Sequence, residues 1–115
     1  MGERGYPDRA MAQRISPLIS SHRAEIEALC CRHHVRRLEL FGSTATGEER
    51  PDSDVDFLVV FEPLPFGTYS DTYFGLKEAL EALLARQVDL VVDSTIKNPY
   101  FRKSVERSKV LLYAA

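Results

Sequence analysis

Apolar and polar residues alternate along the chain in short segments, each with the period of a helix or of a strand. After Pro17 the apolar residues recur at roughly helical spacing, which predicts a helix from Ser16–Pro17 to about His33. Ser16 suits the capping position of this helix, and Pro17 suits its first turn. Residues 1–16 carry glycine, proline and scattered charge without a sustained period, so we expect a flexible N-terminal leader. A single domain over residues 17–115 would follow it.

Three apolar segments have the length and composition of β-strands: residues 35–41, 54–61 and 88–92. The first ends at Gly42. The second is apolar at nearly every position after Asp56, so we expect it to be buried on both faces in the centre of a sheet. Turn-forming residues separate the first two strands at positions 51–53.

The remaining segments read mainly as helices. A short helix is expected over residues 44–49, a longer one over 70–86 and a last one over 97–107, before a short apolar segment at 109–113. The longer helix has a core stripe formed by Leu76, Leu80, Leu83 and Leu84. Helices and strands therefore alternate, which predicts an α/β (α+β) fold with a small mixed β-sheet flanked by helices.

Size and charge narrow the classes of function. The 115 residues suffice for one domain, and 44% hydrophobic with 28% charged residues is the balance of a soluble globular protein. A net charge of −2 argues against direct nucleic-acid binding, and no apolar run approaches the roughly 20 residues that cross a bilayer. The neighbouring cysteines Cys30 and Cys31 are poorly placed to pair with each other, so we expect a reducing, cytoplasmic location.

The chemistry is concentrated between the first two strands. Gly42 and Ser43 form a turn that can offer backbone N–H groups and a hydroxyl to a phosphate. Ten residues later, Asp54 and Asp56 are spaced so that both side chains leave the same face of a strand. Two converging carboxylates repel each other unless a divalent cation neutralises them. This combination predicts nucleotide chemistry.

The third strand supplies a further carboxylate, Asp89, flanked by Val88 and Leu90. An acid among apolar strand residues is costly unless it faces a cleft or a cation, so we expect Asp89 beside Asp54 and Asp56. Asp93 is the rival, because it lies on the same face at the end of the strand. We interpret Asp93 as a capping or loop acid. Three carboxylates can hold two Mg²⁺ ions for in-line displacement at phosphorus, with Asp89 accepting the proton of the attacking hydroxyl.

These residues resemble the DNA polymerase beta-like nucleotidyltransferase superfamily, and the run LKEALEALLARQVDLVV before and around Asp89 is similar to its minimal, MNT or MntA-type members. The resemblance covers about residues 35–113. It implies that Gly42 and Ser43 bind the nucleotide and that Asp54, Asp56 and Asp89 ligate Mg²⁺. Many members have Ala-Arg-Gly after the Gly-Ser pair, whereas this chain has Ala45-Thr46-Gly47, and loop residue Arg50 is a candidate substitute for that arginine.

The resemblance implies a function as well. Minimal members are typically antitoxins paired with HEPN-domain RNase toxins, and several inactivate the toxin by adenylylating one of its tyrosines. The expected activity is therefore Mg²⁺-dependent transfer of AMP from ATP to a hydroxyl of a partner protein. Two alternatives stay open: an antitoxin that acts by binding alone, and a nucleotidyltransferase for a small molecule. The basic residues of the last helix are interpreted as a solvated face: Lys97, Arg102, Lys103 and Arg107.

Overall fold

The structure is a computed structural model that describes residues 15–48 and 50–115. Over these residues one mixed sheet is formed in the order β3-β2-β1-β4. The strands are β1 (Val35–Phe41), β2 (Val55–Phe61), β3 (Val88–Val92) and β4 (Val110–Ala114). Strand β1 is antiparallel to both of its neighbours, whereas β2 and β3 are parallel. The predicted mixed sheet is confirmed.

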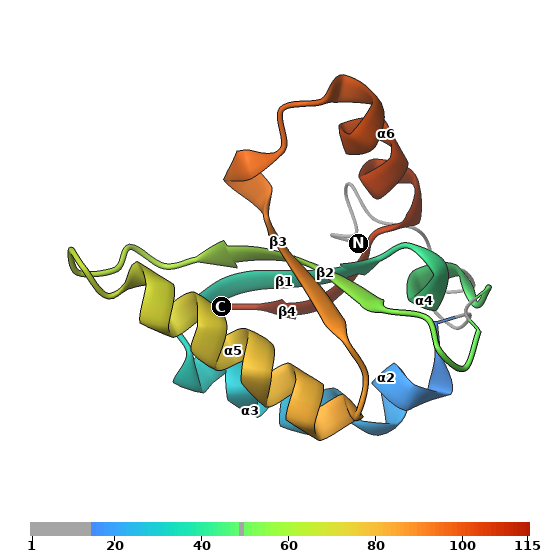
Figure 1. The fold of residues 1–115 in the computed structure, drawn as a ribbon, viewed down its shortest axis with the longest axis horizontal. Helices are drawn as coiled ribbons and strands as arrows, with labels where there is room; N and C mark the ends of the chain where they lie inside the picture. Colours follow the sequence, from blue (N-terminus) through green and yellow to red (C-terminus); the bar gives the residue numbers. More distant parts are fainter. Residues whose placement is uncertain (1–14, 49) are drawn as a thin grey trace.

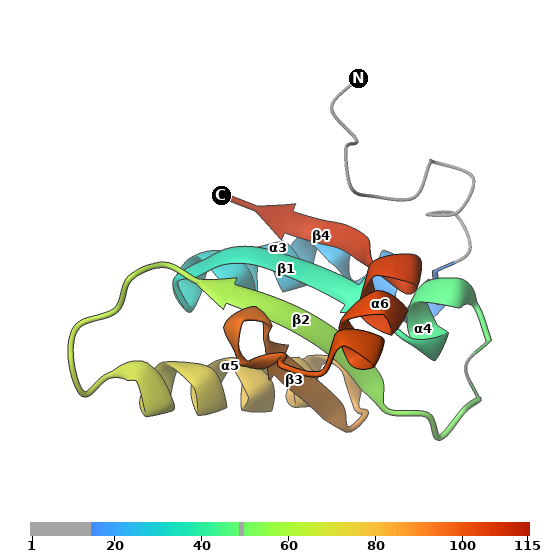
Figure 2. The same cartoon turned by 90° about the horizontal axis from the view of Figure 1, so that it is seen from above.

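The helices lie on both faces of the sheet (Figures 1 and 2). On one face are α2 (Pro17–Ser21), α3 (Arg23–Arg32) and α5 (Tyr69–Leu84). The opposite face carries α6 (Pro99–Ser108), which follows the short 3₁₀ helix η1 (Asp93–Thr95). Helix α4 (Ser43–Thr46) lies at the end of the sheet where β1 stops. The two faces are therefore covered very unequally.

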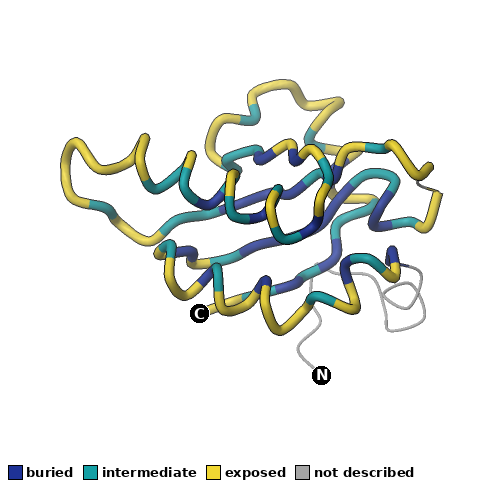
Figure 3. Tube along the Cα trace, turned by 60° about the horizontal axis from the view of Figure 1, so that its bottom comes forward, coloured by how far each residue is buried: buried dark blue, intermediate teal, exposed yellow. Residues whose placement is uncertain are grey.

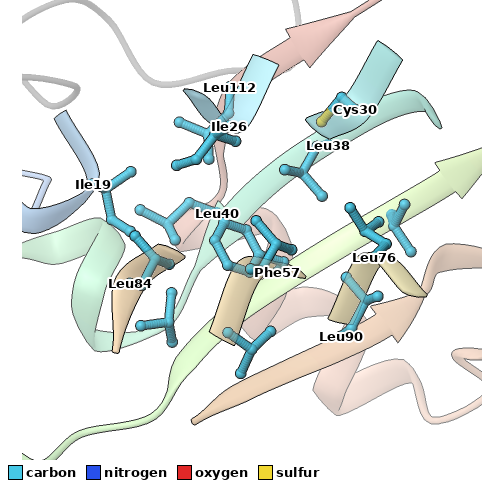
Figure 4. Close-up of a cluster of buried hydrophobic side chains, with 14 of the residues drawn as sticks. Ile19, Ile26, Cys30, Leu38, Leu40, Phe57, Leu76, Leu84, Leu90 and Leu112 are labelled. Carbon is cyan, nitrogen blue, oxygen red and sulfur yellow. The ribbon is translucent and has the colours of Figure 1, made fainter. Parts of the chain in front are cut away.

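The main core lies between the sheet and α2, α3 and α5. Strand residues alternate between the faces, and those on this side are apolar, such as Leu38, Leu40 and Phe57. The stripe of α5 meets them with Leu76, Leu80 and Leu84, all buried. Leu76 and Leu84 are seen among the strand residues in Figure 4. In Figure 3 the buried segments accordingly follow the strands and the inner sides of the helices. A smaller cluster of Phe41, Leu58 and Val105 packs α6 onto the other face.

Most elements predicted from the sequence are present. The strands 35–41 and 88–92 have the predicted bounds, and the central position of the second strand is confirmed. The final apolar segment is a strand, β4, which pairs with β1. Helix α4 is shorter than predicted because Gly47, in a left-handed conformation with φ 80°, ends it at Thr46.

The prediction of one continuous helix to about His33 is wrong. The chain leaves helical geometry at His22, whose φ is −113°, so two helices form instead of one. The Ser16 hydroxyl caps the first of them, as expected. His22 N bonds to the carbonyl of Ile19, which closes α2 with a tighter turn.

Of the proposed leader, residues 1–14 lie outside the described residues. Ile15 and Ser16 are described and are buried, and Ser16 N donates to the carbonyl of Thr44. The division into a leader and a domain stays a prediction. No helix within residues 15–48 and 50–115 is long and apolar enough to span a bilayer.

Candidate active site

One end of the sheet collects the residues that the sequence singled out. Because β1 is antiparallel to β2, the C-terminal end of β1 lies beside the N-terminal end of β2, and parallel β3 starts at the same end. Gly42 follows β1, Asp54 and Asp56 stand at the start of β2, and Asp89 is the second residue of β3. The topology therefore brings together four positions that span 48 residues of sequence.

The carboxylates lie side by side on the face that carries α6. Asp56 and Asp89 are register partners across the parallel β2–β3 pair, so their side chains leave the same face. Asp56 is the most affected by this placement: burial, followed by the charges of Asp89 and Asp54, raises the pKa of its carboxyl from 3.8 to about 6. Three negative charges thus converge at this end of the sheet, as the sequence predicts.

Asp93, the rival third acid, belongs to a different part of the molecule. Its carboxylate pairs with Arg102 at 3.2 Å and with Arg37 at 3.5 Å. It also begins η1 at the far end of β3. The choice of Asp89 over Asp93 as the neighbour of the carboxylate pair agrees with this placement.

Gly42 is the point where the turn touches the carboxylates. It adopts φ 77°, a left-handed conformation that favours glycine. A Cβ at this position would overlap Oδ2 of Asp56. A side chain on residue 42 would thus both strain the turn and push the acid away, so glycine is required for the turn to lie directly against Asp56.

One backbone N–H that the sequence predicts as a phosphate donor, that of Gly42, has a partner within the protein. The Gly42 N–H donates to the hydroxyl of Ser108 at 3.1 Å, so this amide is already used within the protein. Ser43 follows as the first residue of α4, and its role as a phosphate ligand stays a prediction. The hydroxyl of Thr46 bonds to the carbonyl of Ser43 at 3.4 Å and to Glu48 at 3.1 Å.

Arg86 is a residue that the sequence reasoning missed. Its guanidinium donates to the carbonyl of Ser53 through Nε at 2.9 Å and to that of Arg50 through Nη2 at 3.3 Å. These bonds hold the loop that immediately precedes Asp54. The backbone of Arg50 is thus part of this loop anchor, and its N–H also donates to the Ser53 hydroxyl at 2.8 Å. Its side chain is exposed, and its role as a substitute for the arginine of the family motif stays a prediction. No local pattern marks Arg86, because its partners are backbone carbonyls more than 30 residues away.

A cleft of about 680 Å³ opens beside two of the carboxylates. Its walls come from the second half of α5, the start of β3 and the residue before β2, and comprise Asp54, Lys77, Glu81, Ala85, Arg86, Gln87, Val88 and Asp89. Lys77 and Glu81 are paired at 3.1 Å, and Glu81 also accepts from Val88 N. The cleft is therefore polar, and it adjoins the acids on the side away from Gly42.

Comparison with known proteins identifies the class. Residues 23–112 match the family model of the nucleotidyltransferase domain. The protein adenylyltransferase MntA of Thermococcus cleftensis is 40% identical over 86 residues, which are 75% of this chain and 81% of that protein. The chain belongs to the nucleotidyltransferase domain family, and it is a nucleotidyltransferase.

Solved structures agree with this assignment. A structure assigned as a minimal nucleotidyltransferase is 39% identical, with a TM-score of 0.67 over 80% of this chain and 90% of that one. A toxin–antitoxin structure with AMP-PNP shares the fold at 21% identity, with a TM-score of 0.64 over 81% and 73% of the two chains. The predicted nucleotidyltransferase fold is confirmed.

Proposed function

We propose that this protein is a Mg²⁺-dependent protein adenylyltransferase that transfers AMP from ATP to a tyrosine hydroxyl of a HEPN-family toxin, and thereby acts as its antitoxin. The observation that carries the proposal is the convergence of Asp54, Asp56 and Asp89 beside the Gly42–Ser43 turn. Support for a protein acceptor comes from the relatives, which include an adenylyltransferase named MntA, and from the shared fold of toxin–antitoxin structures.

The residues suit magnesium in their charge and their oxygen donors. Asp56 holds its proton up to about pH 6 because burial and two neighbouring carboxylates disfavour its charge, and a divalent cation relieves that repulsion. Over the described residues no three acidic, histidine or cysteine side chains form a complete metal site. Mg²⁺ is commonly held by one or two carboxylates together with substrate phosphates, so Asp56 and its neighbours would share it with ATP. Bound there, it would neutralise the phosphate charge that develops during transfer.

Each residue then has a role in an in-line reaction. Ser43 binds the terminal phosphates and so holds the pyrophosphate that leaves. The acceptor hydroxyl approaches from the opposite side of the α-phosphorus, where Asp89 lies and the 680 Å³ cleft opens. Asp89 takes the hydroxyl proton as the new P–O bond forms and the bond to pyrophosphate breaks. The domain offers a cleft on that side instead of an enclosed acceptor pocket, which favours an acceptor carried by another protein.

A direct test uses the purified protein, the HEPN-type product of a neighbouring gene, Mg²⁺ and ATP labelled at the α-phosphate. Label should appear on the partner, and mass spectrometry should place it on a tyrosine. The double variant Asp54→Asn/Asp56→Asn should abolish the transfer, while Asp52→Asn, in the same loop, should leave it intact. Binding of the partner without transfer would instead support an antitoxin that acts by occlusion, and label on a small molecule alone would contradict the protein acceptor.

A further inference from the structure

Helix α6 reaches the nucleotide-binding turn through the side chain of its last residue, Ser108. The Ser108 hydroxyl accepts the Gly42 N–H at 3.1 Å and donates to the carbonyl of Ser104 at 3.4 Å. Both hydrogen-bonding roles of the hydroxyl are therefore used, and its direction is fixed by its own helix. The bond joins residues 66 apart in sequence, so it sets the position of the turn relative to α6.

The position of this bond matters because the turn is built on a glycine. Glycine has the widest backbone freedom of any residue, and Gly42 lies at φ 77° and ψ −155° with its Cα against Oδ2 of Asp56. The peptide before Gly42 needs an external partner to hold it, since it stands between the end of β1 and the start of α4. The Ser108 hydroxyl is that partner, and it thereby fixes where the next residue, Ser43, begins.

Helix α6 is itself held firmly enough to serve as a support. Val105, on the same side of the helix as Ser108, is fully buried, and Phe101 meets Phe41 edge to face with ring centroids 5.9 Å apart. A closed ring of alternating charges also ties the helix to β1 and η1. Going round the ring, the residues are Glu39, Arg37, Asp93, Arg102, Glu106 and Lys109.

We propose that Ser108 is a positioning residue for the donor nucleotide. It acts through Gly42 by fixing the turn so that the Ser43 amide and hydroxyl are already oriented toward the phosphates of ATP. The inference rests on ATP binding at this turn, which is part of the proposed function. Without the hydroxyl, the turn samples more conformations before ATP binds. ATP binding must then order the turn, which makes the binding free energy less favourable.

The test measures the affinity for ATP in the presence of Mg²⁺ without any acceptor protein, at a temperature where all variants are folded. Ser108→Ala should raise the Kd for ATP about 3- to 10-fold, the range expected for one hydrogen bond. Ser104→Ala is the matched control, because it removes a hydroxyl one turn earlier on the same helix and leaves the Ser104 carbonyl in place. Its Kd should stay close to that of the wild type. Ser108→Thr keeps a hydroxyl and should restore most of the affinity.

Each result separates this inference from the proposed function. Equal affinities for Ser108→Ala and the wild type would overturn it, and so would a loss that Ser108→Thr does not restore, because packing would then be the cause. A wild-type protein that binds ATP but labels no HEPN-type partner contradicts the proposed function and leaves the role of Ser108 standing. A wild-type protein that does not bind ATP contradicts both.

Discussion

At the scale of single residues, the charge of Asp56 is costly to the folded state. Its pKa is raised from 3.8 to about 6 by burial and by the charges of Asp89 and Asp54. The folded state therefore binds more protons than the unfolded chain between these two values, and the free energy of unfolding falls as the pH rises through that window. The cost is in full effect at pH 7, where the enzyme would use these charges, and it disappears below pH 4.

We predict that Asp56→Asn stabilises the fold at neutral pH while it destroys activity. Removing the charge should raise the free energy of unfolding at pH 7 by up to about 3 kcal/mol, with the difference from the wild type fading near pH 4. Urea unfolding at several pH values between 4 and 8 measures this. Asp52→Asn, in the exposed loop, is the control and should follow the wild-type profile. Parallel profiles for Asp56→Asn and the wild type would contradict the assignment.

The effect of Mg²⁺ on thermal stability is a second test of Asp56. If Mg²⁺ binds the folded state and not the unfolded state, it should raise the melting temperature of the wild type in a concentration-dependent way. The increase should be lost in Asp56→Asn, because the variant has lost a ligand. Scanning calorimetry with and without millimolar MgCl₂ measures both, and an equal response from wild type and variant would argue against these carboxylates as the metal site.

Gly42 tests the close approach of the turn to the carboxylates. Gly42→Ala and Gly67→Ala both place an alanine at a positive φ, 77° and 87° respectively, which costs about 1–2 kcal/mol. At position 42 a Cβ would also overlap Asp56, whereas a Cβ at position 67 has no atom of the described part of the chain within 4 Å. Gly42→Ala should therefore lose about 1–3 kcal/mol more than Gly67→Ala in chemical denaturation, and it should lose ATP binding. Equal losses would show that the turn and Asp56 are further apart.

At the scale of elements, hydrophobic periodicity was enough to find β1, β2 and β3, because burial decides where apolar residues must lie. It left β4 as an apolar segment of unassigned structure, because its pairing with β1 is not visible in the sequence. It failed at His22, where local backbone geometry and not burial ends α2. Periodicity also did not reveal that Glu39 is buried. Alternation places this residue in a strand, but its near-complete burial comes from the tertiary packing around it. Arg102, interpreted as part of a solvated face, also pairs with Asp93 from outside its helix, which the sequence does not indicate.

The charge ring around Glu39 leads to a prediction about α6. Both carboxylate oxygens of Glu39 are buried and accept no hydrogen bond from residues 15–48 or 50–115, where they form ion pairs with Arg37 at 3.4 Å and Lys109 at 3.6 Å. Lys109→Met removes one of them and leaves a buried charge less compensated, which should cost about 3 kcal/mol of folding free energy. Lys103→Met changes an exposed lysine of α6 and should stay within about 0.5 kcal/mol of the wild type. Similar effects from both would show that the ring does not stabilise the fold.

For the candidate site, residues that lie close together in the sequence could be predicted from their spacing. Residues that reach the site from distant parts of the sequence could not. Asp54 and Asp56 follow from one strand pattern, and Asp89 was found because an acid stands out in an apolar strand. Ser108 and Arg86 left no such signal, since each acts on backbone groups brought to it by the fold. Side chains that touch the substrate have recognisable types, whereas side chains that position them can be of almost any polar type.

At the scale of the whole molecule, the sheet separates stability from chemistry. The face toward α2, α3 and α5 carries the main core. The other face carries the carboxylates and α6, which packs on a much smaller apolar cluster. The main core is therefore on the layer opposite the carboxylates, and we expect changes on the α6 face to leave that core intact.

This separation predicts where ATP changes the backbone dynamics. Hydrogen exchange measured with and without ATP and Mg²⁺ should show slower exchange in residues 42–46, in 54–57 and in the C-terminal turn of α6, which Ser108 links to the nucleotide-binding turn. Exchange in α3 and in the buried half of α5 should be unchanged, because their amides are already protected by the main core. Protection confined to α3 and α5 would place the nucleotide on the opposite face. Slower exchange at 42–46 with no change in α6 would show that the turn responds to ATP independently of Ser108.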